Sequence, residues 1–215
     1  MRLRLESIYR KLYLRFGPQH WWPAESAFEV MVGAILTQNT NWQNVERAIA
    51  NLKKRRVLGF KKLFRLPQRK LALLIKPAGY YNIKAARLKE LLKFLDARCG
   101  SDIRRLSRRD TWLLRQEMLS VKGVGEETAD SILLYALKRP VFVVDAYTKR
   151  IFSRHGLIPQ DATYGQAQAL FMRNLKPDAG FFNEYHALLV RLGKEYCFKN
   201  NPRCAGCPLE EKIVR

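Results

Sequence analysis

The sequence predicts an all-α protein, and three observations lead to this fold class. Apolar residues recur at helical spacing along most of the chain, as at Phe28, Met31, Val32 and Ile35. Glycine and proline residues interrupt this pattern often enough to cut it into short helices. The only extended run, residues 141–144, is too short and too isolated to build a sheet. With 215 residues, 47% of them hydrophobic, the chain can form one sizeable core or two small lobes.

The expected helices follow one another without a low-complexity linker or an internal repeat. Thr40, with Gln43 three residues later, predicts a capping box, and Asn82 is the expected cap of a basic helix. In chain order the helices are an amphipathic one in residues 1–16, two with apolar stripes at 28–35 and 45–52, the basic one at 83–95, and a pair at 111–121 and 126–137.

The charge of the chain points to a polyanionic partner. Lys and Arg number 40 against 19 Asp and Glu, a formal net charge of +21. Such an excess attracts nucleic acid or an anionic membrane. The longest apolar run, residues 30–36, is far shorter than the roughly 20 residues that span a bilayer. The basic N-terminus could form an interfacial helix or a transit peptide, but Glu6 and the regular apolar spacing favour an ordinary packed helix. We therefore expect a nucleic acid as the partner, and no membrane.

A glycine turn at residues 119–130 (LSVKGVGEETAD) is the first candidate binding site. Gly123, Val124 and Gly125 lie directly before an expected helix, whose amides and positive dipole end favour a phosphate. Taken alone, the two glycines fit a plain connection between two helices better than a phosphate site. Glu126 and Glu127 complement the helix dipole.

Asp145 is the second candidate, because it stands between the extended run and a new helix. An aspartate in this position is an ordinary helix N-cap. A carboxylate at a helix start also stays ionised, which is the state needed to stabilise a sugar cation or to orient an attacking water. Both roles can hold together.

The turn (VKGVGEETA) and the later segment VDAYTKR, with Asp145 and Arg150, together resemble the helix-hairpin-helix (HhH-GPD) DNA glycosylases of the endonuclease III superfamily. The resemblance covers essentially the whole chain and implies an all-α fold of two lobes. Residues 24–139 would form a six-helix barrel that ends in the hairpin. Residues 1–23 and 140–215 would form the second lobe, with Asp145 and a C-terminal cysteine loop.

The resemblance also implies roles for the matching residues. The backbone of residues 123–125, with Lys122 beside it, would bind DNA, and Asp145 would be the catalytic carboxylate. Bifunctional members carry a lysine where this chain has Glu127, and a carboxylate cannot form the Schiff base that leads to strand cleavage. Lys122 occupies a proline position of the motif and is discounted as a substitute nucleophile. A monofunctional enzyme that leaves an abasic site is therefore implied.

Three further segments, WWP at 21–23, FEVMVGAILTQNT at 28–40 and KPAGYYNIKAARL at 76–88, resemble the 3-methyladenine DNA glycosylase III branch. In that branch Trp21, Trp22, Pro23 and Trp42 would enclose the flipped base, with Lys194 near the pocket. Electron-rich indoles suit an N3- or N7-alkylated purine, which is cationic and a good leaving group. Core packing for the tryptophans and a solvated lysine are the alternatives.

Two polar residues complete the implied DNA face. Gln38 would enter the gap left by the extruded nucleotide, with Asn39 as its neighbour, and a helix-terminal residue with local bonds is the alternative. The site would lie between the lobes, with Asp145 on one side and Trp42 and Gln38 on the other.

The C-terminal cysteines form the pattern C-x6-C-x2-C. Relatives with a 4Fe–4S cluster have a fourth cysteine where this chain has Ile213. A cluster with water, Glu210 or Glu211 as the fourth ligand, an empty site and a zinc site stay open in that order. In each case the role is structural. Cys99 is expected to be a small buried residue. The candidate metal ligands are Cys197, Cys204 and Cys207.

The combined expectation is a cytoplasmic, monofunctional DNA glycosylase of base excision repair that hydrolyses the N-glycosidic bond of an alkylated purine. Its expected partner is double-stranded DNA that contains damaged bases, and a monomer is expected because nothing in the sequence suggests a larger assembly. The alternatives are an endonuclease III-like glycosylase for another damaged or mismatched base, and a non-catalytic helix-hairpin-helix protein that only binds DNA.

Overall fold

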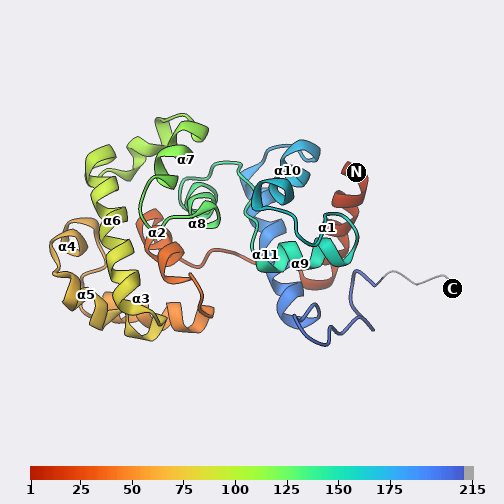
Figure 1. The fold of residues 1–215 in the computed structure, drawn as a ribbon, viewed down its shortest axis with the longest axis horizontal. Coiled ribbons are helices and arrows are strands. Elements are labelled where there is room, and N and C mark those ends of the chain that lie inside the picture. Colours follow the sequence, from red (N-terminus) through yellow and green to blue (C-terminus); the bar gives the residue numbers. More distant parts are fainter. Residues whose placement is uncertain (211–215) are drawn as a thin grey trace. The chain divides into compact units, whose positions relative to one another are not determined.

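The computed structural model describes residues 1–210, and in this part of the chain it contains helices and no strands (Figure 1). The predicted all-α class is confirmed. The chain divides into two compact units. Unit 1 joins residues 1–23 to the chain from residue 139 onward, and unit 2 comprises residues 24–138.

Unit 2 is built around a central helix. Nine consecutive residues of α2, from Phe28 to Leu36, are buried, and α2 packs against α3, α6 and α8. Such an all-round apolar helix can lie only inside a core. The helices of unit 2 are α2 (Ala27–Leu36), α3 (Trp42–Lys54), α4 (Phe60–Arg65), α5 (Gln68–Leu74), η1 (Lys76–Ala78), α6 (Tyr81–Cys99), η2 (Ile103–Arg108), α7 (Thr111–Leu119), α8 (Glu126–Ser131) and the π-helical turn η3 (Ile132–Ala136).

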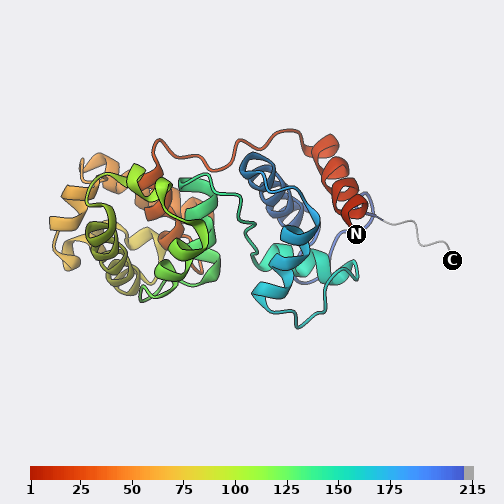
Figure 2. The ribbon, with the colours of Figure 1, turned by 90° about the horizontal axis from the view of Figure 1, so that it is seen from above.

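Unit 1 has an aromatic core between α11 and the helices that pack on it. The rings of Phe142 and Phe171 stack with centroids 3.7 Å apart, and the hydroxyl of Tyr185 donates to the carbonyl of Leu5 at 2.9 Å. The last contact ties the N-terminal helix to α11, which lie side by side (Figure 2). The helices of unit 1 are α1 (Arg2–Phe16), α9 (Ala146–Arg154), α10 (Tyr164–Asn174) and α11 (Ala179–Glu195).

Residues 141–144 are extended and buried, as the sequence predicts, although they pair with no strand within residues 1–210. Side chains of α10 satisfy their backbone instead. The amide of Gln168 donates to the Phe142 carbonyl at 2.7 Å, and the Val144 amide donates to the Tyr164 hydroxyl at 3.3 Å. Buried backbone groups need such partners where no sheet supplies them.

Two predicted helix starts are wrong. The N-cap of α3 is Asn41, whose side chain accepts from the Asn44 amide at 3.0 Å, while the Thr40 hydroxyl accepts from the side chain of the same Asn44. Asparagine caps at least as well as threonine, so the nearer residue takes the role. Asn82 lies inside the first turn of α6, which follows Tyr80 in the left-handed conformation without a side-chain cap.

No helix in residues 1–210 combines the length and the apolar composition that a membrane crossing requires.

Candidate active site

The hairpin between α7 and α8 needs glycine at position 123 for two reasons. Its φ is +90°, which disfavours other residues, and a Cβ atom there would stand 2.3 Å from Cγ of Arg87. Val124 is buried and its amide donates to the carbonyl of Val121 at 3.0 Å, so this amide serves the turn itself. Within residues 1–210, the amides of Gly123 and Gly125 make no comparable backbone bond. Neither of these amides is therefore used by the turn itself.

Gln38 connects the end of α2 to the hairpin. Its Nε2 donates to the Gly123 carbonyl at 2.9 Å and to the Thr128 hydroxyl at 3.0 Å, and its Oε1 accepts from the guanidinium of Arg87. The amide group of Gln38 is thus fully engaged inside unit 2. The exposed Asn39 follows with a left-handed backbone, φ 52°.

A buried lysine, Lys84, holds the end of α2 that leads to Gln38. Lys84 is 1% exposed, and its Nζ donates to the carbonyls of Leu36 and Ala78 at 2.9 and 2.6 Å. The first carbonyl ends α2, and the second ends η1. Burial lowers the pKa of Lys84 to about 8. Because Arg87 lies one turn further along α6, this helix holds both Leu36 and Gln38.

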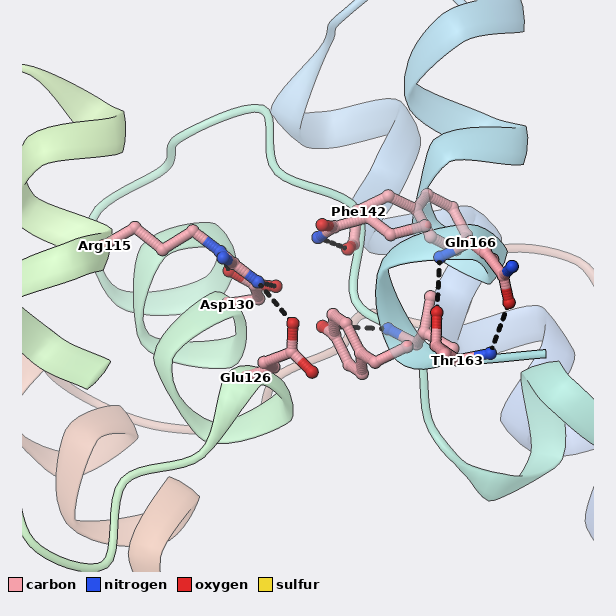
Figure 3. A network of polar contacts seen from close by, with 9 residues as sticks. Arg115, Glu126, Asp130, Phe142, Thr163 and Gln166 are labelled. Carbon is pink, nitrogen blue, oxygen red and sulfur yellow. Dashed lines mark hydrogen bonds and ion pairs between the residues drawn. The ribbon is translucent and has the colours of Figure 1, made fainter. Parts of the chain in front are cut away.

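A buried ion pair locks the two helices of the hairpin together. The guanidinium of Arg115 on α7 donates to both oxygens of Asp130 on α8, at 2.6 and 3.0 Å, and Asp130 is fully buried (Figure 3). Glu126 lies 3.6 Å from the same guanidinium. One acidic residue of the hairpin is therefore part of this lock. Glu127, the position of the lyase lysine in the motif, is exposed in the first turn of α8, and Lys122 is exposed in the turn.

Asp145 is the N-cap of α9, as predicted. Its Oδ1 accepts from the amide of Thr148 at 2.7 Å and from the hydroxyl of Thr148 at 2.9 Å. Its Oδ2 lies 3.6 Å from Nε2 of His186 on α11. His186 is buried, and this burial lowers its pKa, against a smaller opposite influence of Asp145. A neutral imidazole at neutral pH leaves the negative charge of the carboxylate in place.

The tryptophans expected to form the pocket belong to different units. Trp21 and Trp22, half-buried with ring centroids 5.2 Å apart, lie in unit 1, followed by the exposed Pro23. Trp42 lies in unit 2 as the first residue of α3, half-buried, and its indole donates to Glu46 at 2.8 Å. Lys194 is exposed near the end of α11 in unit 1.

Two arginines of α9 organise the cysteine loop. Arg150 donates to the carbonyl of Cys197 at 2.8 Å, and Arg154 donates to the thiol sulfur of Cys197 at 3.3 Å and to the Phe198 and Lys199 carbonyls. Cys197 is buried, Cys204 is exposed and Cys207 is half-buried. Burial raises the pKa of the Cys207 thiol.

Within residues 1–210, no three His, Cys, Asp or Glu side chains gather in a way that could hold a metal ion. Glu210 accepts from the amide of Gly206 at 3.1 Å, whereas Glu211 and Ile213 lie outside the described residues. Cys99 is buried and bonded to the Leu95 carbonyl, as expected of a small core residue.

Several residues of the site escaped the sequence reasoning. Arg87 had a usable signal, because it stands three residues after Lys84 on the same helical face as a second basic residue of the KPAGYYNIKAARL segment. His186 and the Arg115–Asp130 pair had no such sequence signal, because a single sequence does not show which residues of separate helices lie close together.

The fold and the site together define a helix-hairpin-helix protein with an acidic N-cap after a buried extended segment. The sequence profile of the HhH-GPD superfamily of base excision DNA repair proteins matches residues 32–177. The chain belongs to this superfamily, and its predicted membership of the endonuclease III superfamily is confirmed.

Two curated relatives match nearly the whole chain. A Methanocaldococcus jannaschii protein, provisionally described as a DNA repair glycosylase, is 51% identical over 205 residues, which cover 95% of this chain and 93% of the relative. The endonuclease III of Thermotoga maritima is 27% identical over 213 residues, 96% of this chain and 90% of the relative.

Two solved structures are similar as well. The H. pylori 3-methyladenine DNA glycosylase bound to 1,N6-ethenoadenine has a TM-score of 0.78 at 28% identity, covering 90% of this chain and 97% of its own. A trapped endonuclease III–DNA covalent intermediate has a TM-score of 0.82 at 20% identity, covering 97% and 93%, and at this identity it supports the fold alone.

Proposed function

We propose that the chain is a monofunctional DNA glycosylase, which hydrolyses the N-glycosidic bond of a flipped alkylated purine and leaves an abasic site. The observation that carries the proposal is the carboxylate of Asp145, held at a helix start by Thr148 with its second oxygen turned to a buried histidine. The likeness to a 3-methyladenine glycosylase supports the substrate class.

The reaction needs one carboxylate and one water. When the C1′–N bond breaks, its electron pair leaves with the purine, and the sugar becomes cationic. The ionised Asp145 stabilises this cation and orients a water, whose oxygen bonds to C1′ while its proton is released. Because an alkylated purine is already positively charged, it leaves as a neutral base without a strong general acid.

The hairpin and the aromatic residues have binding roles in this proposal. The amides of Gly123 and Gly125 bind a DNA phosphate, with Lys122 beside them. Trp21, Trp22, Pro23 and Trp42 are the proposed stacking surfaces for the base. Lys194 is proposed to lie near the base pocket. Gln38, with Asn39, is proposed to face the DNA duplex. The place of action is the genomic DNA in the cytoplasm.

The absence of lyase activity rests on Glu127. A strand-cleaving enzyme of this class attacks the sugar with an amine, and the hairpin offers a carboxylate at that position. The match to a Thermotoga maritima endonuclease III favours the second candidate, a glycosylase for another damaged base. Borohydride trapping on lesion-containing DNA separates the two, because only an enzyme that forms a Schiff base is trapped. A 4Fe–4S cluster held by the C-terminal cysteines stays a prediction of the resemblance, which iron analysis of the purified protein tests.

The decisive experiment is the release of free methylated base from alkylated duplex DNA. Asp145→Asn should lower release at least about 100-fold and leave DNA binding intact. The matched control is Thr148→Val, which keeps the carboxylate but removes one of its hydrogen bonds, and should cost about 2- to 10-fold. An Asp145→Asn variant with full activity would remove the proposed catalyst. DNA binding without release of any base would leave a non-catalytic DNA-binding protein.

A further inference from the structure

The positive charge of the chain is concentrated in one segment. Residues 47–89 contain 14 of the 40 Lys and Arg residues and not a single Asp or Glu. The other 172 residues hold all 19 carboxylates. Two thirds of the net charge therefore comes from a fifth of the sequence, the part that builds most of α3, the short helices α4 and α5, and the first half of α6.

Five of these 14 cations have partners inside unit 2, apart from Lys62, which donates to the carbonyl of Arg56 in the same basic segment at 2.9 Å. Lys53 pairs with Glu25 and Glu29, and Arg47 contacts Asn44. Lys84 and Arg87 hold the Gln38 loop, as described above, and Lys89 donates to the carbonyls that end α4, Leu63 and Phe64. These five residues are explained by the architecture of the unit itself.

The remaining nine cations are all exposed, and we call them the basic surface: Lys54, Arg55, Arg56, Lys61, Lys62, Arg65, Arg69, Lys70 and Lys76. Within residues 1–210 none of the nine forms an ion pair with a carboxylate. Some exposed cations elsewhere do, as Arg2 does with Glu6 and Lys93 does with Glu90.

The basic surface lies apart from the hairpin within unit 2. In Figures 1 and 2, α4 and α5 form one end of the unit, and the α7–α8 hairpin lies elsewhere in it. Leu63, Leu71 and Ala72 of the two short helices are buried in the core, whereas Phe64 and Leu73 are exposed. The cations of α4 and α5 lie on the outer side of these helices. Only two residues, Leu66 and Pro67, connect the two helices.

Nine like charges without carboxylate partners attract a polyanion. Duplex DNA carries condensed cations, and a protein that neutralises its phosphates releases these cations, which favours binding in proportion to the number of phosphates neutralised. An anionic membrane is the weaker match, because an interfacial helix needs a continuous free apolar face, and of the apolar residues of α4 and α5 only Phe64 and Leu73 are exposed. The regular phosphates of a nucleic acid backbone fit the surface better.

We propose that the basic surface is a second DNA-binding surface, distinct from the hairpin, that contacts the phosphate backbone without reading sequence. The inference rests on the proposed function only in taking duplex DNA as the partner. The surface enlarges the footprint of the protein on DNA and strengthens its binding to undamaged duplex. The chemistry at the damaged base does not depend on it.

A pair of matched triple variants tests the proposal. The first, Lys61→Gln with Arg65→Gln and Arg69→Gln, removes three charges of the basic surface. The control removes one lysine and two arginines that do have carboxylate partners, namely Arg2→Gln, Lys93→Gln and Arg104→Gln. Both variants lose the same net charge, and all six residues are exposed, so a difference between them reports position and not total charge.

The readout is the affinity for an undamaged 30-base-pair duplex, measured by fluorescence anisotropy at several salt concentrations. Each lost phosphate contact lowers the slope of log affinity against log salt by about 0.9. The first variant should lose about two to three units of slope, and the control should lose less than one. Equal losses in the two variants would overturn the proposal. So would unchanged DNA binding together with weakened binding to vesicles of anionic phospholipid, because the surface would then serve a membrane.

A measurement on the unchanged protein covers the case that a variant folds poorly. Acetylation of exposed lysines, followed by mass spectrometry, should show protection of Lys61 and Lys70 by the 30-base-pair duplex and no protection of Lys93. Equal modification of Lys61 and Lys70 with and without DNA would contradict the proposal.

Base release separates this proposal from the proposed function. Under single-turnover conditions with saturating DNA, the first variant should release methylated base at the rate of the unchanged protein. If no protein releases any base while the salt slopes differ as expected, the enzyme proposal fails and the basic surface stands. If release is normal and the slopes are equal, only the basic surface fails.

Discussion

The imidazole of His186 and the carboxylate of Asp145 face each other in the core of unit 1, with Nε2 and Oδ2 3.6 Å apart. The other oxygen of the carboxylate caps α9 through Thr148. The two oxygens thus have different neighbours, a helix end on one side and a buried ring on the other. The ring comes from α11, so the packing of α11 against α9 sets the surroundings of the proposed catalyst.

The first prediction concerns the pH dependence of stability. Burial lowers the pKa of His186 below its ordinary 6.5, so between the two values the unfolded chain binds a proton that the folded chain does not. The contribution of His186 to the free energy of unfolding should therefore be complete above pH 6.5 and should fall as the pH drops below it. Urea unfolding between pH 5 and 8 measures this loss.

His186→Asn should flatten this dependence below pH 6.5. The matched control removes the two other histidines of the chain, His20→Gln with His155→Gln, of which the first is exposed and the second half-buried. This control should keep the dependence. If the control flattens it and His186→Asn does not, the assignment to His186 is wrong.

The second prediction concerns the lock of the hairpin. Asp130→Asn leaves the buried guanidinium of Arg115 without its charge partner, and removing one member of a buried pair costs about 3–5 kcal/mol. Urea denaturation gives the free energy of unfolding. The double variant Arg115→Met with Asp130→Leu buries no charge and should recover most of the loss. A single variant as stable as the unchanged protein would show that the pair contributes little.

The third prediction compares two glycines of the same turn. Gly123→Ala combines a left-handed φ with a Cβ atom 2.3 Å from Cγ of Arg87, whereas a Cβ atom at Gly125 would meet nothing within 4 Å. Overpacking of this kind costs about 1–3 kcal/mol, so Gly123→Ala should lower the unfolding midpoint clearly and Gly125→Ala should not. Adding Arg87→Ala to Gly123→Ala should relieve the part due to the clash. Equal midpoints for the two glycine variants would refute the geometry of the turn.

The fourth prediction concerns Lys84. Lys84→Met leaves the carbonyls of Leu36 and Ala78 without their donor, which costs about 1–3 kcal/mol of stability at pH 7. Because burial lowers the pKa of Lys84 to about 8, the unfolded chain binds more protons than the folded chain between about pH 8 and its ordinary 10.5. The contribution of this lysine to stability should rise with pH in that window. Lys84→Met should lack the rise, and Lys93→Met, at an exposed site of the same helix, should keep it.

The fifth prediction installs the missing amine. Glu127→Lys places a primary amine at the lyase position of the motif, and borohydride should then trap a covalent complex with DNA that holds an abasic site. Glu126→Lys carries the same charge change one residue earlier and should give no trapped complex. Efficient trapping by the unchanged protein would contradict the monofunctional assignment.

The local features of the fold could be predicted from the sequence. Helical spacing gives the all-α class, and the position of Asp145 between an extended run and a helix gives its N-cap role, because both depend on neighbours in the chain. The start of α3 was missed by one residue because Thr40 and Asn41 are both capping residues, and only the backbone path decides between them.

The long-range contacts of the site could not be predicted. Gln38 bonds to a hairpin 85 residues away, and Lys84 points into the core from a helix that reads as a basic, solvated one. A single sequence gives the spacing along each helix but not the rotation of one helix against another. The roles of the tryptophans, Lys194 and the cysteines stay predictions.

The extended segment before Asp145 gives α10 an influence that its own residues do not suggest. Three side chains of this helix, Gln168, Tyr164 and Met172, hold the backbone of Phe142 and Val144. The last of these backbone groups is directly followed by Asp145. A helix with no proposed chemical task thus fixes the position in space of the backbone that carries the carboxylate. Small changes in α10 should therefore alter turnover without weakening the hold on DNA, a pattern easily mistaken for a distant effect.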